Sequence, residues 1–531
     1  MARSFAAPAL VCVLSSASAA QAQDAPTYDA AIAQPLDAGA AAAAGDRPLN
    51  FAAGVSLSET YASNSNGFAI GSSDDFITTV GFDAAVHDRG RLVTLDARYN
   101  FAASFYANGT QSTQITNYLE AVGSLTAIPD HLVIYAKAFA APVTVSNVGI
   151  VTAGDRVVAN GFRNSYGYYV QPDFRFRLGE FATSDTRATY GSTYFTNPAG
   201  SGPVIPIPGV AGPQDTNSRS LTQVFTSGED FDLLKWSLAG VFSEIERKQG
   251  LLSEKGGTAS LQYALSREFS LIGTFGYDAI TATVPLTQNV SGIVALGGFS
   301  WTLGENFSVT VQAGRKYHSG SYIGNLRYNI TPTSSIIASA TDAVTTPEGQ
   351  LLDSLTNLIA TPSGSLSSGD DLLGNGSPAS LPTFSPQGPA NFGFDQNISR
   401  YQTVNVSYLQ DFERNHAALS VFFARRTILS GVFIGPPTTD SWGVRATFAR
   451  NISPRTIGQV GSSYTLDQQL GGEARSLRFN AQVDYAMSRE MRLFFRGDYL
   501  DRQSSAALSA VSPFTRSLTD YELTIGISRA L

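Results

Sequence analysis

The chain has 531 residues, of which 43% are hydrophobic and only 15% are charged, and its formal net charge at pH 7 is −8. Soluble domains usually carry charge on about a quarter of their residues, so this composition argues against an array of ordinary soluble domains. The acidic balance provides no basic footprint for nucleic acid, and we therefore expect no nucleic-acid partner. Glycine (49), phenylalanine (32) and tyrosine (22) are abundant instead.

The N-terminal segment has the features of a secretory signal peptide. Arg3 precedes the apolar stretch FAAPALVCVLSSASAA, and Ala20-Gln21-Ala22 forms a small-x-small cleavage site. We therefore expect a signal peptide at 1–22, which would also contain the single cysteine, Cys12. An exported chain without cysteine needs no disulfide bonds. Residues 23–48 are Ala-rich with no core pattern and are expected to form a periplasmic lead-in.

From residue 49 to the C-terminus, apolar and polar residues alternate in one segment after another. Successive side chains of a strand point to opposite faces, so a period of two predicts strands. Clear examples lie at 51–61, 92–101, 170–178, 442–448 and 520–528.

One hairpin pattern occurs twice. YALSREFSLIGTFGY begins at Tyr263 and YAMSREMRLFFRGDY begins at Tyr485. Each copy predicts two strands joined by a tight turn with Ser-Arg-Glu at its tip. The copies differ most on the face predicted to point inward. There the first copy carries mainly small side chains and the second carries Arg492, Phe494 and Arg496.

Short polar turns punctuate the whole region and set the expected number of strands. Ten turns, each joining two strands, together with a first and a last strand predict about 22 strands, and 18–22 are compatible with the pattern. Longer Gly-, Ser-, Asn- and Pro-rich links are expected between them, the longest at about 343–397 as an extracellular or infolded loop. The ten turns are HDRG (87–90), IPDH (128–131), GEF (179–181), GEDFD (228–232), SREFS (266–270), GENFS (304–308), TPTSS (331–335), DFERNH (411–416), NISPRT (451–456) and MSREMR (487–492).

Tight turns at one end and long loops at the other predict an all-β fold, a transmembrane antiparallel β-barrel of the bacterial outer membrane at 49–531. No plug domain is expected before the first strand, and no apolar run is long enough for a membrane helix. The alternative is a soluble all-β protein, but its solvent face should carry more charge. Aromatic residues expected at strand ends, as in interfacial girdles, are Tyr61, Tyr99, Tyr168, Tyr263, Tyr277, Tyr485 and Tyr499.

The predicted inward face carries mixed charges, which suit a water-filled lumen. Arginine presents a fixed fork of donors that can bind carboxylates or sugar hydroxyls along a pore. The alternative is that these residues only pair with one another. The candidate lumen-lining residues are Asp96, Arg98, Asp173, Arg175, Arg177, Arg187, Lys235, Arg426, Arg445, Arg478, Asp484, Arg492, Arg496 and Asp498.

No catalytic, metal or cofactor motif stands out. The four histidines are scattered, and His87, His131 and His416 lie in or beside turns expected on the periplasmic side. No His or carboxylate spacing indicates a metal site, and no Ser/His/Asp set can be placed together. We therefore expect a protein that is not an enzyme and has no cofactor.

The start of the barrel region resembles a family of outer-membrane β-barrel proteins associated with exosortase/PEP-CTERM and exopolysaccharide systems, within the wider β-barrel porin group. The family pattern is an E-T-Y-x-x-N motif, a D-F segment and a Gly-marked turn. The matching residues are Glu59, Thr60, Tyr61, Asn64, Asp75, Phe76 and Gly90. The chain ends in Leu531, whereas many barrels end in Phe.

The resemblance implies an outer-membrane channel for hydrophilic cargo that takes part in exopolysaccharide export. Its expected partners are outer-membrane lipid and lipopolysaccharide, the barrel-assembly machinery, periplasmic polysaccharide-export proteins and the polysaccharide itself. Two alternatives stay open at this point: a general porin for small solutes, and a structural or adhesive surface barrel.

Overall fold

The computed structural model describes residues 49–65, 73–144, 153, 162–196, 215–247, 250–283, 287–345, 398–430, 437–469, 472–505 and 517–531. The expected signal peptide, the lead-in and residues 346–397 of the expected long loop lie outside this set. Residues 343–345, predicted to begin that loop, instead complete a strand that runs to Thr345. Alternation is weak over ATDAVT, which explains why the sequence pattern ended the strand too early.

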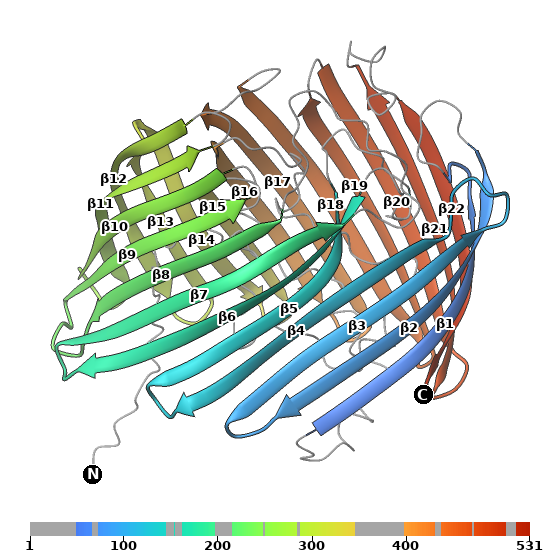
Figure 1. Ribbon diagram of the computed structural model, residues 1–531, viewed down its shortest axis with the longest axis horizontal. Coiled ribbons are helices and arrows are strands. Elements are labelled where there is room, and N and C mark those ends of the chain that lie inside the picture. Colours follow the sequence, from blue (N-terminus) through green and yellow to red (C-terminus); the bar gives the residue numbers. More distant parts are fainter. Residues whose placement is uncertain are drawn as a thin grey trace.

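The described residues form 22 strands in one closed antiparallel sheet (Figure 1). Each strand pairs with the next in the chain, and β22 pairs with β1 to close the barrel. The described residues include no helix long and apolar enough to cross a bilayer. The strands are β1 (Leu49–Ala62), β2 (Asp75–Arg89), β3 (Val93–Tyr106), β4 (Gln114–Ile128), β5 (Leu132–Thr144), β6 (Phe162–Leu178), β7 (Ala182–Thr196), β8 (Thr216–Ser227), β9 (Leu234–Arg247), β10 (Gly250–Ala264), β11 (Phe269–Thr283), β12 (Thr287–Leu303), β13 (Phe307–Lys316), β14 (Ser319–Thr331), β15 (Ser334–Thr345), β16 (Ile398–Asp411), β17 (Asn415–Ser430), β18 (Thr438–Ser453), β19 (Thr456–Gln469), β20 (Gly472–Ala486), β21 (Met491–Ser504) and β22 (Leu518–Ala530).

All ten predicted turns join consecutive strands at one end of the barrel, which we call the short-turn end. The two Ser-Arg-Glu turns are built alike. Ser266 Oγ accepts hydrogen bonds from the backbone N–H of Glu268 (3.2 Å) and of Phe269 (3.0 Å). Ser488 Oγ accepts the matching pair from the residues that follow it, at 3.2 and 3.0 Å. The repeated sequence therefore encodes a repeated turn.

The opposite end, which we call the long-loop end, is less uniform than predicted. The sequence pattern favoured longer links there throughout, but β13 and β14 are joined by Tyr317 and His318 alone. Both residues have a positive φ, 50° and 67°, as a tight hairpin turn demands. Two-residue hairpin turns usually contain Gly or Asn. Tyr317 and His318 lack that signal, so the sequence pattern did not predict a turn here.

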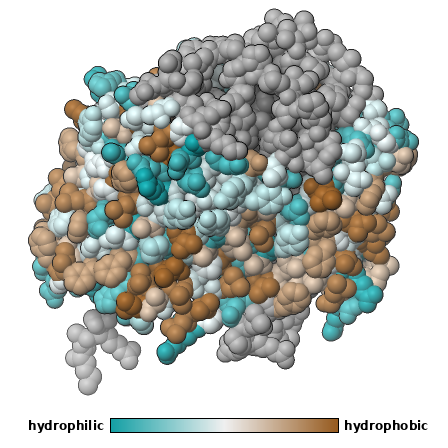
Figure 2. Space-filling view, viewed as in Figure 1, coloured by the Kyte–Doolittle hydropathy of each residue, from teal (hydrophilic) through white to brown (hydrophobic). Residues whose placement is uncertain are grey.

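Large apolar side chains are exposed on every second residue around the outside of the barrel. On β11, Leu271, Phe275 and Tyr277 are 46%, 61% and 53% exposed. On β22, Leu523 and Ile525 are 49% and 53% exposed. Figure 2 shows apolar residues spread over the lower part of one such face, with hydrophilic residues gathered above them. Water would not tolerate so large an apolar surface, so this is the wall of a transmembrane barrel of the outer-membrane type.

The expected aromatic girdle is only partly correct. Tyr61, Tyr263 and Tyr485 lie at strand ends, whereas the other four tyrosines predicted there lie well inside their strands. The short-turn end is instead edged by aromatic groups that meet across strands. Phe181 and Trp236 have ring centroids 5.7 Å apart, and Phe231 contacts both.

The seam between β22 and β1 is closed by side chains as well as by the backbone. On the inner face, Thr60 and Thr524 share a hydrogen bond of 2.9 Å between their hydroxyls. At the long-loop end the fully buried Asp520 accepts hydrogen bonds from Ser63 Oγ (2.9 Å), Asn64 N (3.1 Å) and Ala153 N (2.9 Å). One carboxylate therefore ties the chain before β2 and the chain between β5 and β6 to β22.

Candidate functional site: the inner wall of the barrel

The strand register assigns each residue to the outer or the inner face, because the exposed apolar side chains mark the outer one. All fourteen predicted lumen residues fall on the inner register. Their contribution to function stays a prediction. In strand order they are Asp96 and Arg98 (β3), Asp173, Arg175 and Arg177 (β6), Arg187 (β7), Lys235 (β9), Arg426 (β17), Arg445 (β18), Arg478 and Asp484 (β20), and Arg492, Arg496 and Asp498 (β21).

The inner wall divides into two arcs of different chemistry. At mid-height, the inner residues of β8 to β17 are Ser, Thr, Asn, Gln, Gly, Ala and apolar residues, and we call this the neutral arc. The charged inner residues of the neutral arc lie nearer its two ends, for example Lys235 and Asp278. The remaining strands, β18 to β22 followed by β1 to β7, form the charged arc. Most of the predicted lumen residues lie there.

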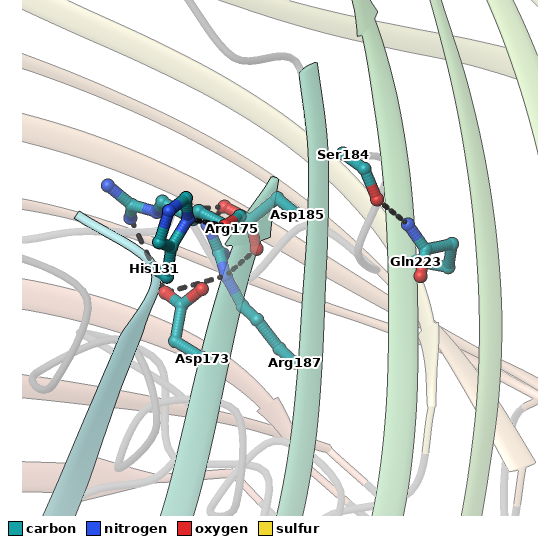
Figure 3. A network of polar contacts seen from close by, with 7 residues as sticks. All are labelled: His131, Asp173, Arg175, Ser184, Asp185, Arg187 and Gln223. Atoms are coloured by element: carbon teal, nitrogen blue, oxygen red, sulfur yellow. Dashed lines mark hydrogen bonds and ion pairs between the residues drawn. The ribbon is translucent and has the colours of Figure 1, made fainter. Parts of the chain in front are cut away.

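A quartet of charges on β6 and β7 forms the clearest unit of the charged arc (Figure 3). Asp173 lies opposite Arg187, and Arg175 lies opposite Asp185. Arg175 reaches both carboxylates at 3.4 Å, while Arg187 is 3.5 Å from Asp173 and 3.0 Å from Asp185. Each cation thus contacts both anions. The four side chains hold one another in place on the inner face and together carry no net charge. His131 holds the neighbouring backbone, since its ring and its carbonyl group both contact the backbone of Arg175.

Two further charge pairs belong to the same arc. Lys137 on β5 is 3% exposed, and its Nζ lies 3.7 Å from Glu120 Oε1 on β4. Arg496 on β21 binds Asp498 through two contacts of 2.7 and 2.8 Å. A buried charge is tolerated only with such a partner. The charged arc is therefore held largely by its own ion pairs.

The neutral arc is a lattice of hydroxyl and amide groups that bond to one another. Thr274 Oγ1 shares a hydrogen bond of 3.0 Å with Ser260 Oγ and donates one of 2.9 Å to Gln312 Oε1. Ser300 and Thr310 are linked at 3.0 Å, and similar pairs join β10 to β11 and β16 to β17. Ser260, Thr274 and Gln312 are only 9%, 6% and 4% exposed, so these three groups bond mainly to one another. A neutral group that does reach the lumen can exchange partners with water or with a hydroxylated solute at small cost, because no charge has to be desolvated.

The predicted residues differ in how far they reach solvent. Arg175, Arg177 and Lys235 are exposed toward the short-turn end. Asp173 and Arg426 are buried, at 4% and 7% exposure, and Arg426 Nε donates to Ser399 Oγ at 3.1 Å. The buried members can act on a solute only through the exposed ones. Those three and Arg445, which is exposed near the middle of β18, are therefore the first candidates for direct contact.

Sequence reasoning missed several inner charges. Asp185 lies two residues before Arg187 on the same face, and the alternation in SDTRATY carries that signal. In the sequence, Lys137 only interrupts the apolar segment LVIYAKAFAAPV that begins at Leu132. Its neighbours on the inner register, Tyr135 and Phe139, are aromatic and packed in a cluster, so β5 lacks a polar inner face that would have revealed it.

No group of three or more His, Cys, Asp or Glu side chains able to hold a metal ion occurs in the described part of the chain. The turn histidines make local pairs: His87 contacts Asp96, and His416 contacts Asp411.

The residues that carry the family resemblance lie on β1, just after it, on β2 and in the turn between β2 and β3. Glu59 accepts a hydrogen bond of 2.7 Å from Thr78, and the ring of Tyr61 packs against Phe76 at 5.3 Å. Asp75, fully buried, accepts hydrogen bonds from the backbone of Asn108 (2.8 Å) and the hydroxyl of Thr110 (2.6 Å). A Cβ on Gly90 would lie 2.7 Å from the carbonyl oxygen of Val93, so that turn requires glycine. The motif therefore shapes the pairing of β1 with β2 and the links on either side of β3.

Comparison with known proteins found no matching family model and no curated protein of similar sequence. Among solved structures, the FpvAI–pyocin S2 complex aligns with 9% identity and a TM-score of 0.47, covering 91% of this chain and 70% of that one. The siderophore receptor PirA from Acinetobacter baumannii aligns with 7% identity and a TM-score of 0.46, covering 91% and 80%. The FrpB iron transporter from Neisseria meningitidis, F3-3 variant, aligns with 13% identity and a TM-score of 0.43, covering 94% and 83%.

Proposed function

We propose that this protein is an outer-membrane channel for hydrophilic cargo and that the cargo is an exported exopolysaccharide. The single observation that carries the proposal is the neutral arc. At mid-height, the inner face of ten consecutive strands, β8 to β17, carries no charge, and hydroxyl and amide groups lie there among small and apolar side chains. A neutral sugar chain needs exchangeable hydrogen bonds along its path and no tight site that would stop it.

The size of the barrel supports passage of a polymer. Twenty-two strands spaced about 4.8 Å apart and tilted by about 40° form a ring roughly 40 Å across between opposite backbones. Barrels of 16 or more strands enclose an aqueous lumen. Among the described residues, every strand belongs to the barrel wall and none forms a separate plug domain.

The hydroxyl lattice can be tested with paired substitutions on one strand. Thr274→Val removes an inner hydroxyl of β11 that bonds to two neighbours, whereas Thr281→Val makes the same change on the outer register. We expect Thr274→Val to slow permeation of neutral oligosaccharides into liposomes by about fivefold, the equivalent of one hydrogen bond of about 1 kcal/mol. Thr281→Val should leave permeation unchanged. Equal effects of both substitutions would contradict a role for the lattice.

The cargo is tested in the cell by deleting the gene. Loss of surface polysaccharide with normal uptake of small solutes supports export. Unchanged polysaccharide with reduced solute uptake would refute export and favour a general porin, for which the charged arc would supply ion selectivity. Loss of surface attachment alone would favour an adhesive barrel.

A further inference from the structure

The sheet is split between the long-loop ends of β14 and β15. A comparable split separates β4 from β5, where residues 114–118 pair only with β3 and residues 141–144 pair only with β6. From the short-turn end, β14 and β15 pair only as far as Gly324 opposite Ala340. Beyond that point, residues 319–323 continue to pair with β13 and residues 341–345 continue to pair with β16. Every backbone bond between β14 and β15 that a continuous wall would make is missing there. The two neighbouring strands separate over five residues each, out of 13 in β14 and 12 in β15.

The ends of β15 and β16 are buried on both faces, unlike a barrel wall. Near the short-turn end, the outer-register side chains of these strands face outward. Val406, for example, is 41% exposed. Toward the long-loop end, the same register carries Asp342, Val344 and Arg400, which are 0%, 1% and 6% exposed. The inner-register residue Tyr401 is also buried, at 3%. Another layer of the protein must therefore cover the outer face of these ends.

That layer is the inner face of the neighbouring wall. Val344 and Ile398 belong to one apolar cluster with Ile280, Leu252 and Tyr317. Ile280 and Leu252 lie on the inner register of β11 and β10. The backbones of β12 and β17 also approach each other, although four strands separate them along the sheet. These contacts indicate an overlap in which β15 to β17 bend inward and pack beneath β10 to β14. The same cluster continues along the inner face to Phe139 on β5 and Tyr169 on β6.

Arg400 holds the overlap together. Its Nε donates to Asp342 Oδ1 at 2.7 Å, and its Nη2 contacts the other oxygen of the same carboxylate. Across the split, Nη1 donates to the hydroxyl of Ser319, and Nη2 also donates to the carbonyl oxygen of Gly320 on β14. The side chains of Arg400 and Asp342 are only 7% and 0% exposed. One cation therefore replaces the missing backbone bonds between β14 and the infolded strands.

We propose that the long-loop ends of β15, β16 and β17 are a gate that narrows the lumen, and that Arg400 is its latch. This inference rests on the proposed channel function. Opening would move the infolded ends outward. This motion breaks no backbone hydrogen bonds between β14 and β15, because the split has already removed them, and its free-energy cost is lower for that reason. Packed layers lie about 10 Å apart, so the infolded layer removes a substantial part of the opening at that end.

The latch is tested by measuring how readily a thiol inside the overlap is labelled. In a Cys12→Ser background, which leaves no native cysteine, Val344→Cys places the reporter in the overlap. We expect Arg400→Ala to raise its labelling rate by an impermeant thiol reagent at least tenfold. Arg400→Lys should give a smaller increase, because an ammonium cannot reach both strands with the same fork. A reporter at the exposed Ser505 should be labelled quickly in all variants.

Conductance across planar bilayers provides the second measurement. Arg400→Ala and Asp342→Asn should each increase single-channel conductance, whereas Arg219→Ala should not. Arg219 pairs with Glu244 on the outer register of β8 and β9, so its loss removes an ion pair outside the overlap. Folding of each variant is checked by heat-modifiable migration on SDS gels.

The outcomes separate the gate from the channel. Unchanged labelling of the reporter thiol at position 344 in folded Arg400→Ala and Asp342→Asn proteins would overturn the gate, whatever the conductance. Faster labelling in barrels that never conduct would support the gate and refute the channel. Faster labelling together with higher conductance would support both.

Discussion

The carboxylate of Asp520 gives the sharpest test of how the barrel is closed. Asp520 lies at the long-loop end of β22, is 0% exposed and accepts three hydrogen bonds from outside its own strand. Asp520→Ala would leave two backbone N–H groups and the hydroxyl of Ser63 without this acceptor. Asp520→Asn would keep one oxygen and replace the other with a donor that faces Ala153 N.

The magnitude follows from those three bonds. A hydrogen bond to a charged group contributes about 1.5–3 kcal/mol, and the contributions are not additive when neighbouring donors regain water. We therefore expect Asp520→Ala to lower the free energy of unfolding by about 3–5 kcal/mol. Asp520→Asn should cost about 1–2 kcal/mol, because one acceptor is kept.

The assay is equilibrium unfolding by urea or guanidinium in lipid vesicles, followed by tryptophan fluorescence. Asp501→Asn is the matched control, since Asp501 lies on the adjacent strand and its hydrogen bonds to Gln503 and Thr519 are exposed. It should cost less than about 0.5 kcal/mol. Equal stability of Asp520→Ala and Asp501→Asn would refute the view that Asp520 ties the seam.

Three other predictions concern packing, the bilayer and the lumen. A Cβ on Gly526 would lie 2.2 Å from the ring of Phe494. Gly526→Ala should therefore lower the free energy of unfolding by about 1–3 kcal/mol in the same assay. Adding Phe494→Leu to that variant should restore most of the lost stability. Leu523 faces outward at the middle of β22 and is 49% exposed. Leu523→Arg should therefore lower the free energy of unfolding by about 2–4 kcal/mol. A change near zero would contradict contact of Leu523 with lipid. Asp173→Asn removes one anion from the quartet on β6 and β7. The reversal potential measured in a salt gradient should therefore shift toward anion selectivity. An unchanged reversal potential would show that ions do not pass near the quartet.

Most of the barrel wall can be predicted from the order of the residues alone. Alternation is a local property, since each residue's face follows from its neighbours two positions away. That locality is why the number of strands, the ten short turns and the inner register of Arg175, Arg445 and Arg496 could be read without a structure. The Ser-Arg-Glu turns could also be predicted from the sequence, because the hydroxyls of Ser266 and Ser488 bond to the backbone of their own turns.

Contacts between residues that are far apart in the chain become visible only in the folded barrel. Asp520 and Asn64 are 456 residues apart, and Arg400 and Ser319 are 81 apart, so no local pattern joins them. Nor could the pattern show that one register of β15 and β16 faces outward near the short-turn end and becomes buried beyond Ala340. A period of two reports which residues share a face. Whether lipid, water or another layer of the sheet covers that face depends on where the strand ends bend, and that depends on contacts formed only once the barrel is closed.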